Sequence, residues 1–222
     1  MKKLLVMAMT IIIASYSAFA QNTLSPKEKA ELAKMTKQQI DERASKSARK
    51  ALKTFEKEGW KVAPGHLPLE KQLDRSFMMQ EQYDADFNCI YTFGDAQSVG
   101  ENYDAAKMQA TELAKMNLVS KLQTEVTALV EANISNLALP EGEAASVTEV
   151  VMQSKSLISQ NIGKVTTVLE CYRDLPNKKK EVRMYVACNS KNAMEAAKKA
   201  ILAQVAKENS NLAKQLEKAL DN

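Results

Sequence analysis

The first clear hydrophobic period along the chain is helical and lies in its N-terminal quarter. Between residues 33 and 55, apolar positions recur at intervals of three, four or seven residues, with charged residues among them. Ser25, Pro26 and Glu28 predict the start of this helix, because they supply a cap, a fitting first residue and a capping box. The pattern predicts a long basic helix that ends near Gly59 and buries one narrow stripe. The stripe consists of Ala33, Ile40, Ala44, Ala48, Ala51 and Phe55.

The period changes to two in three later segments, which predict β-strands. Phe87–Ser98 alternates apolar and polar positions, and its glycine at 94 indicates a bulge or a close approach of another backbone. Val165–Tyr172 and Val182–Cys188 flank a polar turn at residues 176–180 and predict an antiparallel hairpin. We expect one buried hairpin face, made of Val165, Thr167, Leu169, Cys171, Val182, Met184, Val186 and Cys188. We expect a wetter face with Glu170, Tyr172, Arg183 and Tyr185.

Further helical periods lie between and after the strands. Their predicted starts are Pro68, Asn102, the capping box at Ser146–Glu149, and Asn189 or Ser190. The helix from Asn102 to about Ile134 is rich in alanine in its first half, which predicts close packing on a sheet. The last helix is expected to break near residues 208–210.

Together these elements predict an α+β fold. Its core is a small antiparallel sheet of about three strands, covered on one face by long helices, with an N-terminal helical extension. We divide the chain into a signal peptide at residues 1–20, a basic extension and linker at residues 21–66, and an α+β body at residues 67–222. We expect this body to fold without residues 21–59.

The first twenty residues match a secretory signal peptide. Lys2 and Lys3 precede an apolar run too short to span a bilayer, and Ala18-Phe19-Ala20 forms an A-x-A cleavage site. We therefore expect cleavage after Ala20 and a soluble periplasmic product. No cysteine follows the site to carry a lipid, and no second apolar stretch predicts a transmembrane segment in the mature chain.

The net charge of +4 is unevenly distributed. Residues 21–62 hold eleven Lys or Arg against six Asp or Glu, so the extension is basic. Such a field attracts nucleic acid, anionic lipid or an acidic partner. Because acidic residues are interspersed among the basic ones, we interpret the segment as a solvated helix face and expect no nucleic-acid partner.

The three cysteines and the single histidine predict no metal site. Cys89, Cys171 and Cys188 fit no zinc spacing, and His66 is the only histidine. In an oxidising compartment an odd number of cysteines leaves at least one thiol unpaired. We interpret the cysteines as small apolar side chains on strands, and whether one pair forms a disulfide stays open.

The chain contains no recognised catalytic motif. Two pairs of carboxylates flank the first predicted strand, Asp84 with Asp86 and Glu101 with Asp104, where carboxylates commonly act as caps. His66 is interpreted as a loop-packing residue. Residues 94–100 could cradle an anion but lack a phosphate-binding pattern. We therefore assign no catalytic, cofactor-binding or metal-binding residue and expect a protein that is not an enzyme.

Residues 87–206 carry a pattern found in bacterial cell-envelope proteins. A strand that ends in a glycine-containing turn leads into an alanine-rich helix over Phe93–Ala114. A later hairpin reads Val-Leu-Glu-Cys-Tyr and then Glu-Val-Arg-Met-Tyr-Val. This order resembles the twenty-kilodalton surface lipoprotein family and is similar to the N-terminal domain of the flagellar assembly protein T. The resemblance implies a small α+β envelope domain with no established enzymatic role, although this chain lacks the lipidated cysteine.

These patterns predict a non-enzymatic periplasmic envelope protein of a Gram-negative bacterium, acting as a scaffold or interaction module for an envelope protein partner. One alternative is a carrier of a small apolar or peptide ligand held between sheet and helices, which a pocket of a few hundred Å³ would favour. Another is a hydrolase with an unrecognised carboxylate site, which shifted carboxylates in one cleft would favour. The identity of the partner and the oligomeric state stay open.

Overall fold

The computed structural model describes residues 25, 27, 37–137, 147, 149–151 and 153–220. Contacts divide the chain into two compact units, Met1–Lys34 and Met35–Asn222, and every labelled helix and strand lies in the second unit. The expected signal peptide lies outside the described residues. The capping boxes at residues 25–28 and 146–149 fall partly outside them, so neither box is tested.

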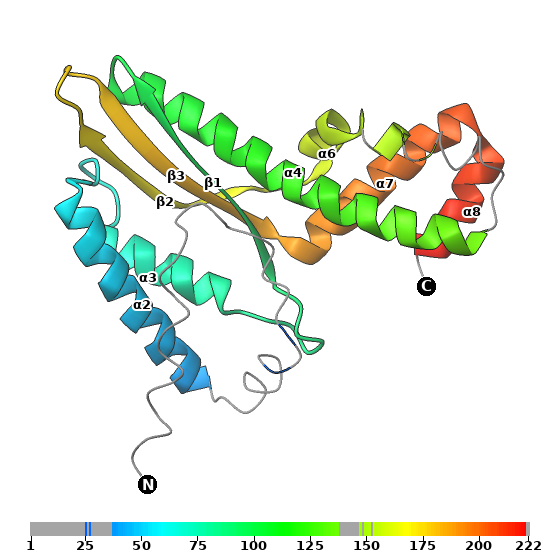
Figure 1. The fold of residues 1–222 in the computed structure, drawn as a ribbon, viewed down its shortest axis with the longest axis horizontal. Helices are drawn as coiled ribbons and strands as arrows, with labels where there is room; N and C mark the ends of the chain where they lie inside the picture. The colour runs from blue at the N-terminus through cyan, green and yellow to red at the C-terminus, as the bar shows by residue number, and fades with distance from the viewer. Residues whose placement is uncertain are drawn as a thin grey trace, which may run out of the picture. The chain divides into compact units, whose positions relative to one another are not determined.

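The fold is α+β and is built on a three-stranded antiparallel sheet, as the sequence predicts. The strands are β1 (Tyr91–Gly100), β2 (Thr166–Asp174) and β3 (Lys180–Asn189). Their order is β1-β3-β2, so the predicted hairpin β2–β3 is confirmed and β1 pairs with the other edge of β3 (Figure 1). β1 begins after the predicted Phe87, which has a positive φ of 61° in the preceding turn.

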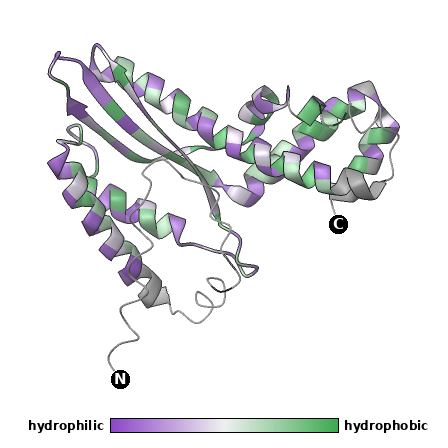
Figure 2. Cartoon of the chain, in the orientation of Figure 1, coloured by the Kyte–Doolittle hydropathy of each residue, from purple (hydrophilic) through white to green (hydrophobic). Residues whose placement is uncertain are grey.

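Two helices cover one face of the sheet around β2. They are α2 (Lys37–Lys57) and α3 (Leu69–Gln80), which pack on each other, and α3 also contacts β2. Among the stripe residues whose side chains are described, Ala44, Ala48 and Phe55 are buried as predicted, and Ala51 is partly buried against the same cluster. Hydrophilic residues prevail on α2 in Figure 2, as the predicted basic helix requires.

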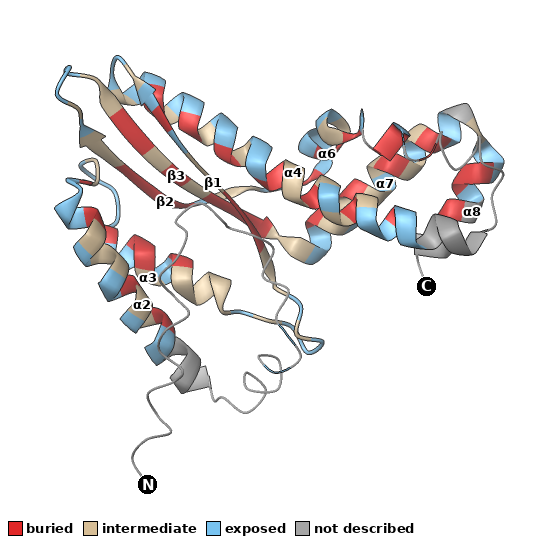
Figure 3. Ribbon diagram, viewed as in Figure 1, coloured by how far each residue is buried: buried red, intermediate tan, exposed pale blue. Residues whose placement is uncertain are grey.

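The opposite face of the sheet is covered by α4 (Tyr103–Leu137), so the sheet carries helices on both faces instead of the one expected. The helix starts at the predicted cap, where the Asn102 Oδ1 accepts a hydrogen bond of 2.9 Å from the Ala105 amide. Its contacts with β1 are very close, since a Cβ on Gly94 would lie 2.1 Å from the Ala114 carbonyl oxygen. The predicted close approach of backbones at Gly94 is therefore confirmed. Buried positions recur along α4 in Figure 3.

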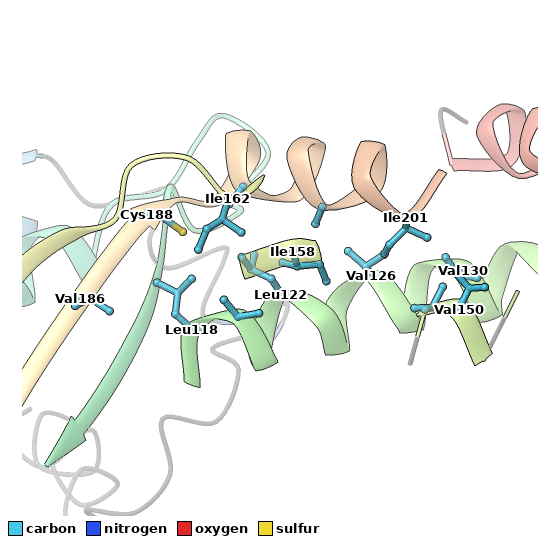
Figure 4. Close-up of a cluster of buried hydrophobic side chains, with 14 of the residues drawn as sticks. Leu118, Leu122, Val126, Val130, Val150, Ile158, Ile162, Val186, Cys188 and Ile201 are labelled. Carbon is cyan, nitrogen blue, oxygen red and sulfur yellow. The ribbon is translucent and has the colours of Figure 1, made fainter. Parts of the chain in front are cut away.

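The largest apolar cluster joins α4 to three further helices and to β3 (Figure 4). These helices are α6 (Lys155–Asn161), α7 (Ser190–Glu208) and α8 (Ser210–Leu220). The predicted cap of α7 is confirmed, because the Asn189 side chain accepts from the Asn192 amide. The predicted break is also confirmed at Asn209, whose side chain accepts hydrogen bonds from the first turn of α8. Among the described residues, no helix combines the length and apolarity needed to cross a membrane.

The predicted face of β3 is correct, but the predicted face of β2 is wrong over half its length. Opposed residues of an antiparallel pair lie on the same face, and Thr167 is opposite Val186 as the prediction requires, although Thr167 itself is exposed and not buried. The register then shifts between Thr167 and Leu169, so that Leu169 is opposite Tyr185. The extra residue of this bulge moves the following side chains to the other face. Leu169 and Cys171 consequently pack against α2 and α3, whereas Val182, Met184, Val186 and Cys188 pack with α4.

The segment between α2 and α3, which the sequence interprets as a linker or ordered loop, is docked on the edge of β2. Lys61 and Tyr172 exchange two backbone hydrogen bonds of 2.7 and 2.8 Å. Trp60 is buried against Phe55 and within the cluster that contains Leu169. Contacts therefore join α2 to the sheet, although the sequence places α2 in a separate extension.

Candidate functional site

A polar cluster surrounds the carboxylate of Glu170 on β2. The Tyr103 hydroxyl donates a hydrogen bond to Glu170 Oε1. Lys107 Nζ lies 2.6 Å from the same oxygen, and His66 Nε2 lies 3.5 Å from it. We call these four residues the Glu170 cluster. Two donors from the first turns of α4 and the ring of His66 from the loop before α3 converge on one carboxylate oxygen.

The buried side chain of Gln72 holds the loop before α3 against β2 beside the Glu170 cluster. Its Oε1 accepts a 2.7 Å hydrogen bond from the Glu170 amide, and its Nε2 donates to the Leu67 carbonyl at 2.6 Å. Both ends of a buried amide are thus satisfied, which avoids the cost of an unpaired polar group. Together with the bridge between Lys61 and Tyr172, Gln72 fixes the loop that carries His66.

The chemistry of the Glu170 cluster favours a structural role, in which its contacts hold neighbouring elements together. Burial is the main cause that raises the pKa of Tyr103, and the hydrogen bond and negative charge of Glu170 raise it further. Tyr103 therefore stays a neutral hydroxyl donor at physiological pH. Glu170 Oε1 is already engaged by this hydroxyl and by the Lys107 ammonium. Nucleophilic catalysis needs an activated nucleophile beside a base, whereas this arrangement ties α4 and the loop to β2.

One carboxylate of each pair that flanks β1 in the sequence is engaged by a partner. Asp84 Oδ1 accepts hydrogen bonds from the amides of Asp86 and Asn88 at 3.0 and 2.8 Å, and the bond from Asn88 is the main cause that lowers the pKa of Asp84. Glu101 forms an ion pair with Lys179 at 2.7 Å. The segment at 94–100 is strand β1 itself, and the close contact of Gly94 with α4 leaves no cradle for an anion there.

Three carboxyl groups with shifted pKa values come from three different segments of the chain. Hydrogen bonds from Lys180 and then Lys61 lower the pKa of Asp174, at the end of β2, to about 2. Burial raises the pKa of Glu125 on α4. Asp84, whose pKa is lowered, precedes β1. The hydrolase alternative would need such groups in one cleft. Asp84 and Glu125 both lie near enough to Cys89 for their charge to raise its pKa, whereas Asp174 is engaged by two lysines at the end of β2.

Cys171 and Cys188 are buried free thiols. Burial raises the pKa of Cys171 and that of Cys188 to about 12, and it also raises the pKa of Cys89. Cys171 is opposite Arg183, five residues along β3 from Cys188, which corresponds to about 17 Å of strand. This separation rules out a disulfide between Cys171 and Cys188. Their burial agrees with the interpretation as small apolar side chains. In the described part of the chain, no three His, Cys, Asp or Glu residues are grouped as a metal site requires.

One surface of α2 is strongly basic. We call it the α2 basic face, and it consists of Lys46, Arg49, Lys50, Lys53 and Lys57, all of them exposed. These residues follow one another at intervals of one, three or four, so they lie on the side of the helix opposite its buried stripe. Within the described residues none of the five has an ion pair, whereas Arg43 on the same helix pairs with Glu81.

A hollow of about 390 Å³ lies between α3 and the sheet, and we call it the α3 hollow. Its lining residues are Arg75, Met79, Gln82, Tyr91, Lys164, Thr166, Ala187, Cys188 and Asn189. A second hollow of about 440 Å³ lies between α6 and α7 and includes Lys199 and Lys207. The α3 hollow has the size and location that the carrier alternative requires.

Sequence reasoning did not find the Glu170 cluster or the α3 hollow. The alternation in the sequence places Glu170 on the wetter face of the hairpin. No residue pattern predicts the bulge in β2 that turns Glu170 toward α4. Arg75 and Lys164 are 89 positions apart in the chain, and only the packing of α3 on the sheet brings them to one hollow. The chain matches no protein family model, no curated protein and no solved structure. The resemblance to the surface lipoproteins and to the flagellar assembly protein T therefore stays a prediction.

Proposed function

We propose that the protein is a non-enzymatic envelope protein of a Gram-negative bacterium that acts in the periplasm as an interaction module for an acidic partner protein. The observation that carries this proposal is the α2 basic face, where five exposed cations have no ion pair among the described residues. Clustered charge of one sign steers an oppositely charged partner and sets the orientation of the encounter.

The packing of α2 supports a role in recognition. Ala44, Ala48 and Phe55 are buried against the body, so the helix presents its cations from a fixed position. Fixing the helix before binding lowers the entropy lost on association. A helix whose exposed cations only kept the protein soluble would not need to recognise a particular partner.

The predicted leader supports the periplasmic location. Lys2 and Lys3, the apolar run and the Ala18-Phe19-Ala20 site are the features that export and cleavage require. N-terminal sequencing of protein from the periplasmic fraction should begin at Gln21. Protein that still begins at Met1, or that stays with membranes after a high-salt wash, would contradict this location.

Site-specific crosslinking in the native envelope tests the partner. A photo-crosslinking amino acid at Ser47, beside the α2 basic face, should capture a protein with an acidic surface. The variant Lys46→Glu, Lys50→Glu and Lys53→Glu should reduce capture about tenfold, since three favourable charge pairs become repulsive. Added salt should weaken capture in the same direction.

A matched variant separates the effect of position from that of net charge. Lys71→Glu, Lys199→Glu and Lys214→Glu change the charge by the same amount at exposed positions on α3, α7 and α8. Capture should persist in this control. Equal capture by the α2 variant and the wild type would remove the proposed role of the α2 basic face.

The carrier of a small ligand stays the second candidate, and the α3 hollow of about 390 Å³ is the observation that favours it. Small-molecule sites commonly have volumes of about 300–1,000 Å³, so this hollow falls at the lower end. The hydrolase alternative receives no comparable support from the described carboxyl groups.

A further inference from the structure

We propose that the α3 hollow binds a small organic anion, with its carboxylate between Arg75 and Lys164 and its apolar part over Met79 and Tyr91. This inference rests on the carrier function and is independent of the α2 basic face. It narrows the ligand from a small apolar or peptide molecule to one that joins an acidic group to a short apolar body.

Two cations without acidic partners define the charge of the hollow. Arg75 lies on α3 and Lys164 precedes β2, and both line the α3 hollow. Neither forms an ion pair in the described part of the chain, and no lining residue is acidic. A concave site lined by one sign of charge concentrates ions of the opposite sign. Arginine and lysine both donate strong hydrogen bonds to a carboxylate.

The start of α7 adds to the positive potential. Asn189, the residue immediately before α7, lines the hollow. Its side-chain oxygen accepts from the Asn192 amide, so the side-chain NH₂ group is the part of this amide that can donate to a ligand. The N-terminal end of a helix carries partial positive charge. The helix therefore supplements the two cations that come from other elements.

Part of the remaining lining suits an apolar group. Met79 and Tyr91 are partly buried and pack on the small cluster formed by Phe93, Val168 and Ala187, so they present the accessible apolar surface of the hollow. Methionine adapts its shape to a neighbouring apolar body. A carboxylate with a chain of a few carbons would thus place its charge at the cations and its chain on this surface.

Titration of the mature protein with three probes tests the chemistry of the ligand. Hexanoate combines both parts, hexanol has only the apolar part, and inorganic phosphate has only the charge. Backbone amide shifts at Tyr91 and Asn189 in NMR spectra should saturate with hexanoate. Hexanol and phosphate should each bind about tenfold more weakly, because each lacks one set of contacts. Equal binding of phosphate or hexanol, or no saturation with hexanoate, would overturn the proposal.

Variants test the position of the site. Arg75→Gln and Lys164→Gln should each weaken hexanoate binding about tenfold, the effect of losing one charge-assisted hydrogen bond. The control Lys199→Gln with Lys207→Gln removes two cations from the hollow between α6 and α7 and should leave binding unchanged. Unchanged binding in both Arg75→Gln and Lys164→Gln would overturn the assignment. Because these variants leave the α2 basic face intact, its partner crosslinking tests the interaction module separately.

Discussion

At Gly94 the sheet and α4 approach so closely that the position has no room for a side chain. An added Cβ would lie 2.1 Å from the Ala114 carbonyl oxygen and 2.6 Å from the Leu118 Cβ. Both contacts involve atoms that cannot swing aside as the end of a flexible side chain can. The small residues on α4 and the glycine on β1 are therefore parts of one contact, which the sequence predicts from the two patterns separately.

Gly94→Ala should lower the free energy of unfolding by about 3 kcal/mol, because overpacking against backbone forces α4 away from β1. Urea unfolding followed by circular dichroism measures this change. Gly163→Ala is a suitable control, since a Cβ there would meet nothing within 4 Å and only its positive φ of 74° causes strain. The control should lose about 1 kcal/mol. A smaller loss for Gly94→Ala than for Gly163→Ala would show that the contact yields easily.

Tyr103 reports the state of the Glu170 cluster through its ionisation. Burial is the main cause of its raised pKa, followed by the hydrogen bond to Glu170 and the charge of Glu170. A raised pKa in the folded state stabilises the protein below the ordinary tyrosine pKa of about 10, and this contribution is lost as the pH rises further. Glu170→Gln should therefore lower the pKa of Tyr103 without returning it to its ordinary value, because burial persists.

NMR titration of ring-labelled tyrosine can follow this change, with Tyr91 as an internal reference outside the cluster. Wild-type Tyr103 should titrate at a higher pH than it does in Glu170→Gln. If the two proteins give the same titration curve, the hydroxyl of Tyr103 is not bonded to Glu170 in solution.

Among the elements, β3 and β2 show where the sequence predicts correctly which side of the sheet a side chain faces and where it does not. Strict alternation predicts the buried face of β3 correctly because β3 itself carries no inserted residue and pairs with β1 in an unbroken register. In β2 the bulge near Val168 inserts one residue and transfers Leu169 to the side of α2 and α3. Thr166, Thr167 and Val168 all have high strand propensity, so the sequence pattern does not show which residue of β2 is the inserted one. Caps were easier to predict, since Asn102 and Asn189 act on the residues next to them.

Val186 tests the face of β3 that both the sequence and the structure assign to the core. Its side chain is buried in the cluster with α4. Val186→Asp should lower the free energy of unfolding by about 3 kcal/mol or more, because it places a carboxylate without a partner among apolar side chains. Gln97→Asp on β1 is the control, since Gln97 is exposed, and it should change stability by about 0.5 kcal/mol or less. Comparable urea midpoints for the two variants would contradict the assigned face.

For the whole molecule, composition and contacts divide the chain at different places. The excess of basic residues continues to about residue 62, which is why the sequence suggests an extension before residue 67. Contacts place the division between Lys34 and Met35, and α2 belongs with the sheet. The basic residues indicate which face of α2 is exposed. The few buried side chains of α2 determine what the helix packs on. The narrow stripe was identified from the sequence, but its packing partner on β2 depends on the bulge.

This division predicts two different outcomes for two truncations. Removing Gln21–Lys34 should leave the cooperative unfolding of the body unchanged, because these residues belong to a separate unit.

Removing Gln21–Gly59 also removes Phe55 and the alanines of α2, and it exposes the apolar surface formed by Leu73, Leu169 and Cys171. Burial of a single large apolar side chain contributes about 1.5–3 kcal/mol, so the loss is a large part of the stability of a domain. We therefore expect the longer truncation to lose cooperative unfolding, in contrast to the independent body expected from the sequence. Urea unfolding followed by circular dichroism measures this, because its signal comes from the sheet and the remaining helices and does not depend on the contact of Trp60 with Phe55, which the longer truncation removes. A sharp unfolding transition of unchanged midpoint in the longer truncation would show that α2 adds nothing to the core.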